Sequence, residues 1–251
     1  MKEIILTLSG IIFIFMMTFL GALTILFRKR KTGELSKNIF LGFAGGVMLA
    51  SSFFSLLIPS FNYSKMINIS HALPAAGGII IGSVFILFFD IIISKNENKN
   101  YKDKKMFLAM TLHNIPEGLS VGLTFGLALS NYQDITIASG IIFALGIGIQ
   151  NFPEGAALSL PLYDSTKSKK KALLLSTLSG VVEPIFALIG IFLATKVVYL
   201  MPWSLCFGAG SMIYVIIDEL IVNCESNKEK RIVNLSFIVG FLIMMILDLC
   251  F

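Results

Sequence analysis

Eight long runs of apolar residues constrain this chain more than any other feature of its sequence. They cover residues about 4–27, 37–58, 75–94, 106–129, 135–163, 170–198, 201–223 and 231–250. Each run is long enough for a transmembrane helix, which needs about 20 apolar residues. Charged residues make up only 14% of the chain, whereas a soluble domain carries about 25%. Backbone groups in lipid must pair internally and no alternating barrel pattern is present. We therefore predict an all-α membrane protein with eight transmembrane helices in a single domain, residues 1–251.

The basic residues between the runs predict how the helices are oriented. Of the 20 Lys and Arg residues, 17 lie at the connections after the first, third, fifth and seventh runs; only Lys2, Lys65 and Lys196 lie on the other side. Short loops rich in Lys and Arg stay in the cytoplasm, so both termini are expected outside it. The same placement explains the net charge of +5 without a nucleic-acid partner.

A six-residue motif occurs twice inside these runs, as HNIPEG at 113–118 and as QNFPEG at 150–155. Residues three and four apart share a face of an α-helix, so each copy directs a carboxylate and an imidazole or amide the same way. The proline of each copy removes one backbone hydrogen bond, to the carbonyl of Leu112 or of Ile149. One such copy is compatible with an ordinary proline kink. Two copies favour a functional centre, because ionisable groups in a membrane usually mark ion or substrate pathways.

A third carboxylate, Glu183, precedes Pro184 in the sixth run. At about 1.5 Å per residue, Glu117 and Glu183 lie roughly 16 and 20 Å from the cytoplasmic ends of their helices, near the middle of a core about 30 Å thick. Glu154 reaches a similar depth if its helix is tilted. Unpaired carboxylates are costly in lipid, and a divalent cation would remove that cost. Imidazole, carboxylate and amide donors together suit Zn²⁺, Fe²⁺ or Mn²⁺.

These motifs resemble those of the ZIP (Zrt/Irt-like protein) metal transporters, and the glutamine that opens the second copy is most similar to their prokaryotic branch. The resemblance implies a binuclear metal centre in a two-layer helix bundle, with inward flux by a sliding form of alternating access, and dimers. It assigns one metal to His113, Glu117, Gln150 and Glu154, and a second to Asn114, Asn151 and Glu183, with Glu117 and Glu154 bridging. Relatives often carry His or Asp where Gln150 and Asn151 stand here, so the neutral amides imply a second site of lower charge.

Polar residues on the second run are candidates for the outer entrance of a transport pathway. Met48 and Ser55, with Ser51 and Ser52 between them, lie at helical spacing on that run. Packing is the alternative interpretation for Met48.

Acidic residues and glycines outside the motifs have two interpretations each. Asp218 and Glu219, near the cytoplasmic end of the seventh run, are either a structural pair or a metal relay at the exit. Asp248 lies near the end of the last run, where a solvated carboxylate costs little.

Glycines recur at helical spacing in Gly42/Gly46, Gly78/Gly82 and Gly118/Gly122/Gly126. They indicate close helix packing, with a sliding surface between moving helices as the alternative.

Together with the resemblance, these features predict an importer of divalent metal ions in the bacterial inner membrane, and the resemblance implies that it is a homodimer. Zinc is the first expected substrate, with iron, manganese and cadmium as further ones, and no organic cofactor is expected. An intramembrane zinc-dependent hydrolase would need an HExxH motif, which is absent, and Asn114 stands where its base would be. We therefore predict that the chain is not an enzyme. A metal-sensing membrane subunit without flux would share the site and differ only in transport.

Overall fold

The described part of the chain is almost entirely helical and contains no strand. The computed structural model describes residues 1–28, 33–94, 101–132, 135–196, 198–221 and 226–250. The elements are α1 (Lys2–Leu23), η1 (Thr24–Phe27), α2 (Glu34–Ser51), η2 (Ser52–Leu57), α3 (Ile58–Met66), α4 (Ala72–Ser94), α5 (Tyr101–Leu129), α6 (Ile137–Thr166), α7 (Lys169–Gly180), α8 (Val182–Leu193), η3 (Val198–Leu200), α9 (Met201–Val215), η4 (Ile216–Leu220) and α10 (Asn227–Cys250). The prediction of an all-α membrane protein is confirmed.

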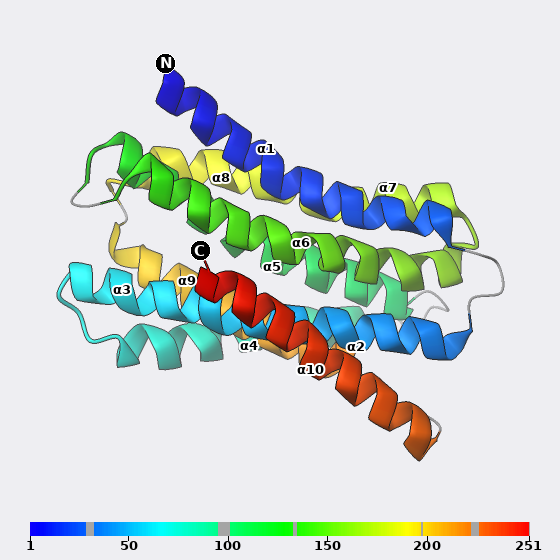
Figure 1. The fold of residues 1–251 in the computed structure, drawn as a ribbon. Coiled ribbons are helices and arrows are strands. Elements are labelled where there is room, and N and C mark those ends of the chain that lie inside the picture. The colour runs from blue at the N-terminus through cyan, green and yellow to red at the C-terminus, as the bar shows by residue number, and fades with distance from the viewer. Residues whose placement is uncertain (29–32, 95–100, 133–134, 197, 222–225, 251) are drawn as a thin grey trace.

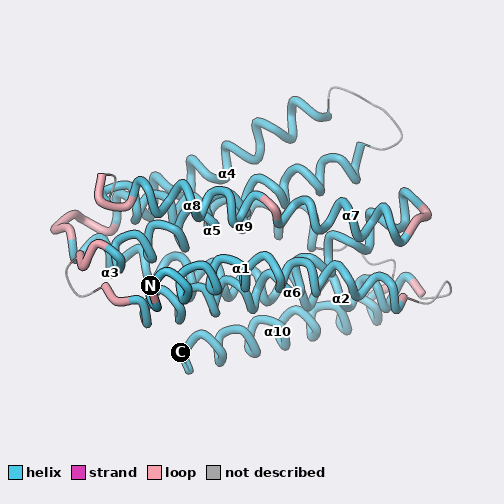
Figure 2. Tube along the Cα trace, turned by 90° about the horizontal axis from the view of Figure 1, so that it is seen from above, coloured by secondary structure: helices cyan, strands magenta, loops and turns pink. Residues whose placement is uncertain are grey.

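Among the described residues, seven helical segments are long and apolar enough to cross a membrane. They match seven of the eight predicted runs, and the second continues through η2 and α3 to Met66 instead of ending near residue 58. The remaining run corresponds to α5, which has 29 residues but carries His113, Asn114 and Glu117 in its middle. These polar side chains lower its hydropathy. The count of eight membrane passes therefore stays a prediction, but both termini lie toward the same end of the bundle, as an even count requires (Figures 1 and 2).

The helices form two groups, one above the other in Figure 1. The upper group contains α1, α5, α6, α7 and α8, and its closest pairs are α1 with α6 and α5 with α8. The lower group contains α2, α3, α4, α9 and α10, with α2 paired to α10 and α4 to α9. Helices α4 and α10 lie on opposite outer sides of the bundle (Figure 2). Contacts of α5 with α9 and of α2 with α6 join the two groups.

Glycines allow the helices of each pair to pack closely against each other, as the sequence predicted. A Cβ atom on Gly46, Gly82 or Gly122 would overlap a backbone oxygen of the paired helix. Such contacts suit helices in lipid, where association depends on van der Waals packing. The three predicted glycine rows face α10, α9 and α8, their partners within a group. They therefore pack helices inside the groups, and the interface between the groups is formed by other residues.

A cluster of ion pairs and hydrogen bonds lies at the end of the bundle opposite the termini, and its Lys37–Asp164 pair joins the two groups. The Asp164 carboxylate on α6 contacts Arg28 Nη2 at 3.2 Å and Lys37 Nζ, on α2, at 2.8 Å. The Lys169 ammonium donates to the backbone oxygens of Leu26 and Arg28, both at 2.7 Å. This end carries many of the basic residues that predict the cytoplasmic face.

Candidate metal centre

Helices α5 and α6 bring the two copies of the motif face to face. Both helices continue through their prolines, so the helical spacing of each copy is retained. His113 and Glu117 therefore lie one turn apart on α5, as do Gln150 and Glu154 on α6. All four side chains are almost fully buried, with exposures of 0 or 1%.

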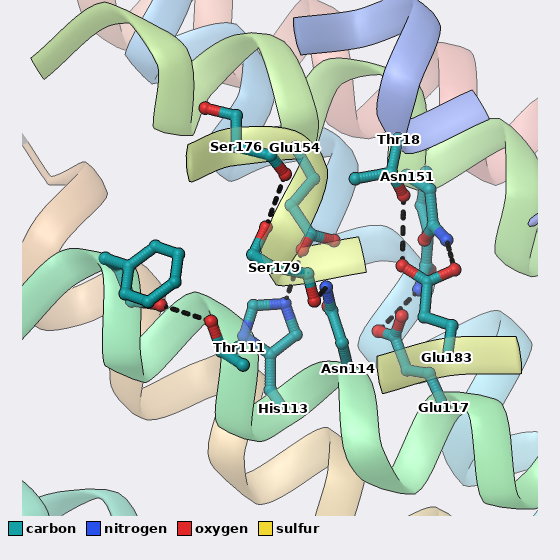
Figure 3. Close-up of polar contacts among 12 residues, drawn as sticks. Thr18, Thr111, His113, Asn114, Glu117, Asn151, Glu154, Ser176, Ser179 and Glu183 are labelled. Carbon is teal, nitrogen blue, oxygen red and sulfur yellow. Dashed lines mark hydrogen bonds and ion pairs between the residues drawn. The ribbon is translucent and has the colours of Figure 1, made fainter. Parts of the chain in front are cut away.

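The imidazole of His113 and two carboxylates meet between these helices. His113 Nε2 lies 2.9 Å from Glu154 Oε1, and Figure 3 shows the two side chains pointing toward each other. Potential ligand atoms of His113, Glu117 and Glu154 all lie within 4.8 Å of one another. One cation could contact all three groups, since zinc–ligand distances are about 2.0–2.2 Å for nitrogen and oxygen donors.

The amides of the second motif hold the carboxylates of the neighbouring helices. Gln150 Nε2 donates to Glu117 Oε1 at 2.7 Å, and Asn151 Nδ2 donates to Glu183 Oε2 at 2.7 Å. The Thr18 hydroxyl of α1 donates to Glu183 Oε1 at 3.0 Å, so both oxygens of Glu183 are engaged (Figure 3).

A break between α7 and α8 positions Glu183. Pro184 has no N–H to donate to the Gly180 carbonyl, and the chain turns at Val181 between the two helices. Glu183 consequently lies in the first turn of α8. Asn114 Nδ2 donates to the Ser179 carbonyl oxygen at 3.1 Å, which supplies a partner for a backbone group beside the break.

Five buried side-chain oxygens of the site have no hydrogen-bond partner among the described residues. They are Asn114 Oδ1, Glu117 Oε2, Gln150 Oε1, Asn151 Oδ1 and Glu154 Oε2. In the described chain, none of the three carboxylates forms an ion pair with Lys or Arg. A buried, unpartnered acceptor is costly, and a cation would satisfy several of these oxygens at once. The donor set therefore fits a divalent metal ion.

The seven residues predicted to bind metal lie together at this centre, whereas two of their hydrogen-bond partners were not predicted. The structure brings together His113, Asn114, Glu117, Gln150, Asn151, Glu154 and Glu183. Thr18 and Ser179 were missed. Thr18 is one of the few hydroxyl residues within the first apolar run, and this was the one signal that pointed to it.

The residues predicted to line a transport pathway lie in three kinds of place: at a cavity, in the buried interior and on the surface. Ser55 lines a cavity between the two helix groups. Met48, Ser51 and Ser52 are fully buried, and Met48 belongs to the apolar core. Asp218 lies exposed on η4, and the side chain of Glu219 lies outside the described residues.

Comparisons with known proteins agree with this geometry. The family model described as ZIP zinc transporter matches residues 105–248. The chain is 33% identical over 248 residues to the zinc transporter GufA of Myxococcus xanthus, covering 92% of this chain and 93% of that protein. It is 32% identical over 278 residues to the zinc transporter ZupT of Chlorobaculum parvum, covering 97% and 99%. It is also 30% identical to the zinc transporter ZIP11 of Xenopus tropicalis, covering 83% and 86%. The chain therefore belongs to the ZIP family, in its prokaryotic branch, and is a membrane transporter and not an enzyme.

Proposed function

We propose that this protein imports divalent transition-metal ions, zinc first among them, across the bacterial inner membrane into the cytoplasm. One observation carries the proposal: a histidine and two glutamates converge in a fully buried site beside five unpartnered side-chain oxygens. The relatives named as zinc transporters support zinc as the substrate. Iron, manganese and cadmium are further substrates in this proposal, because mixed nitrogen and oxygen ligands are not strongly selective.

The first metal is bound by His113, Glu117, Glu154 and Gln150. Gln150 holds Glu117 by one carboxylate oxygen and leaves Oε2 for the cation. Glu154 likewise contacts His113 through Oε1 and keeps Oε2 without a partner. On metal binding the His113 imidazole exchanges its contact with Glu154 for the cation. The hydrogen bonds thus position the carboxylates without using all of their acceptor capacity.

A second metal is bound by Asn114, Asn151 and Glu183, with Glu117 and Glu154 shared between the two ions. This site binds more weakly, since Asn114 and Asn151 contribute neutral oxygens. Both oxygens of Glu183 also accept hydrogen bonds from Thr18 or Asn151, and these must be exchanged for the ion. The binuclear centre is therefore filled in order, with the His113 site first.

Transport needs the buried ion to reach each face in turn. The site is built from the upper helix group, α5 to α8 with Thr18 of α1, and the lower group provides the surface along which it can slide. Alternating access by this movement, termini outside the cytoplasm and a homodimeric assembly complete the proposal. The last two rest on the charge distribution and on the family resemblance.

Uptake into proteoliposomes tests the function. Purified full-length protein should accumulate zinc well above protein-free vesicles, with competition by cadmium, manganese and iron(II). Equilibrium zinc binding should be measured on the same preparation. Binding without uptake would contradict the transport proposal and favour the metal-sensing subunit, while absence of both would contradict the metal site.

Replacing Gln150 by histidine should increase the preference for zinc. An imidazole suits zinc better than an amide oxygen does, whereas manganese prefers oxygen ligands. We expect the ratio of zinc to manganese uptake to rise by about tenfold in Gln150→His. His71→Gln, which changes an exposed histidine far from the site in sequence, should leave the ratio unchanged. An unchanged ratio in Gln150→His would show that residue 150 is not a ligand.

A further inference from the structure

Helix α1 reaches the metal centre through Ile14 and Thr18, which lie one turn apart and are fully buried. Two glycines of the upper helix group fix the backbone and the side chain of Thr18. A Cβ atom on Gly155 would overlap the Thr18 carbonyl oxygen, and one on Gly180 would lie 2.8 Å from Thr18 Cγ2. The side chain of Thr18 is therefore held against the break between α7 and α8, beside Glu183.

Two donors hold the Glu183 carboxylate, one from α1 and one from α6. The Thr18 hydroxyl donates to Oε1 at 3.0 Å, and Asn151 Nδ2 donates to Oε2 at 2.7 Å (Figure 3). Hydrogen bonds to an ionised group are roughly twice as strong as those between neutral groups. An ion that binds Glu183 must therefore compete with protein donors for both carboxylate oxygens.

The Thr18 hydroxyl has a second acceptor within reach, the backbone oxygen of Ile14. This oxygen lies 3.5 Å from Thr18 Oγ1, one turn back on α1. A threonine hydroxyl in a helix can bond to the carbonyl four residues earlier. Because a hydroxyl carries one hydrogen, Thr18 donates either to Glu183 or to Ile14. Rotation about its C–O bond exchanges the two acceptors, and the buried donor keeps a partner in both positions.

Asn151 differs from Thr18 in this respect. Its Nδ2 lies 2.7 Å from Glu183 Oε2 and 3.4 Å from the Ile14 oxygen, and an amide nitrogen carries two hydrogens. Asn151 can therefore bond to Glu183 and to Ile14 at the same time. Thr18 is the donor whose bond to Glu183 can be given up and restored without a change in the rest of the site.

We propose that Thr18 is a positioning residue for release from the second metal site: its hydroxyl bonds to Glu183 when the ion leaves and turns to Ile14 when an ion binds. This inference rests on the second metal of the proposed function. Because the hydroxyl competes with the ion for Glu183, it weakens binding and speeds release. Removal of the hydroxyl should therefore tighten binding, whereas the loss of a residue that merely supports a metal ligand lowers affinity 10- to 100-fold.

Calorimetric titration of the purified full-length protein with Zn²⁺ in detergent tests the sign of this effect. Thr18→Val keeps the shape of the side chain without its hydroxyl, and it should tighten the weaker of two binding steps about tenfold and leave the stronger step unchanged. Thr18→Ser retains the hydroxyl and should bind zinc like the unchanged protein.

Thr7→Val is the matched control for this titration. Thr7 is buried on the same helix, and its hydroxyl has no hydrogen-bond partner among the described residues. The control should leave both binding steps unchanged. An unchanged or weaker second step in Thr18→Val would overturn the proposal. Thr18→Ala also removes the hydroxyl and should give the same tightening, so it decides the question if the valine variant does not fold.

Uptake kinetics test the role of Thr18 in release. In Thr18→Val the KM for zinc and the maximal rate should fall together, because the ion binds more tightly and leaves more slowly. A higher KM would contradict the release role. If the unchanged protein binds only one zinc ion, the second site of the proposed function is wrong and this inference fails with it. If the unchanged protein binds two ions and transports neither, the proposed transport is wrong, and the titration still decides whether Thr18 competes with the ion.

Discussion

Zinc uptake should fall by at least about 100-fold when Glu117 or Glu154 is replaced by glutamine. Each change removes a negative charge from the site but keeps the volume of the side chain and one oxygen acceptor. The hydrogen bond from Gln150 to residue 117 can therefore persist, and so can the contact between His113 and residue 154. What is lost is the charge that makes a divalent cation the best partner for the site.

The same substitutions should not destabilise the metal-free protein. Among the described residues no Lys or Arg pairs with the three buried carboxylates, so their burial is a cost to the fold, and a neutral amide is cheaper to bury than a carboxylate. The melting temperature without metal should stay constant or rise. Zinc should raise the melting temperature of the unchanged protein, because a ligand that binds only the folded state stabilises it, and this shift should disappear in both variants.

Glu3→Gln is the matched control for these variants, because it removes an exposed carboxylate outside the site. It should retain full uptake and the full thermal shift with zinc. If Glu117→Gln and Glu154→Gln transport zinc at the rate of the control, the buried glutamates are not on the transport path. If they lose both uptake and thermal stability without metal, the loss reports misfolding and the prediction of a stable metal-free variant is wrong.

The half-sites could be predicted from the sequence because they depend only on helical geometry. Residues 113 and 117 share a face of any α-helix, and so do residues 150 and 154. The glycine rows could also be predicted from the local sequence, since a row of glycines on one face of a helix in lipid favours close packing against another helix. The seven predicted centre residues followed from these patterns together with the family resemblance, and all seven lie together in the structure.

The partners from distant segments could not be predicted in this way. Thr18 reaches Glu183 across 165 positions of sequence. Its hydroxyl also lies 3.5 Å from the Ile14 carbonyl of its own helix, so a Thr at this position needs no partner elsewhere. Asp248 was misjudged for a related reason: distance from the end of a run says nothing about which helix covers a side chain. Only the packing of η2 and α6 against α10 shows that one of its oxygens is buried.

Replacing Gly118 by alanine should lower both thermal stability and zinc uptake, although alanine is the better helix former. A Cβ atom at this position would overlap the Glu183 carbonyl oxygen and lie 2.7 Å from the Glu183 Cα atom. The obstacle is backbone, so no change of rotamer relieves it, and α5 must move away from α8. Overpacking of this kind costs about 1–3 kcal/mol. The gain in helix propensity is about 1 kcal/mol. The net effect is therefore destabilising, and the melting temperature should fall by several degrees.

The effect on transport follows from which residues the contact connects. Gly118 is adjacent to Glu117 and presses on the backbone of Glu183, so separating the helices moves two carboxylates apart. A displacement of about 1 Å is enough to spoil a preorganised site, and uptake should fall about tenfold or more. Gly33→Ala is the control, since nothing lies within 4 Å of a Cβ atom at this exposed position. That variant should keep both its melting temperature and its uptake. If Gly118→Ala matched it in both measurements, the contact between α5 and α8 would not set the spacing of the metal ligands.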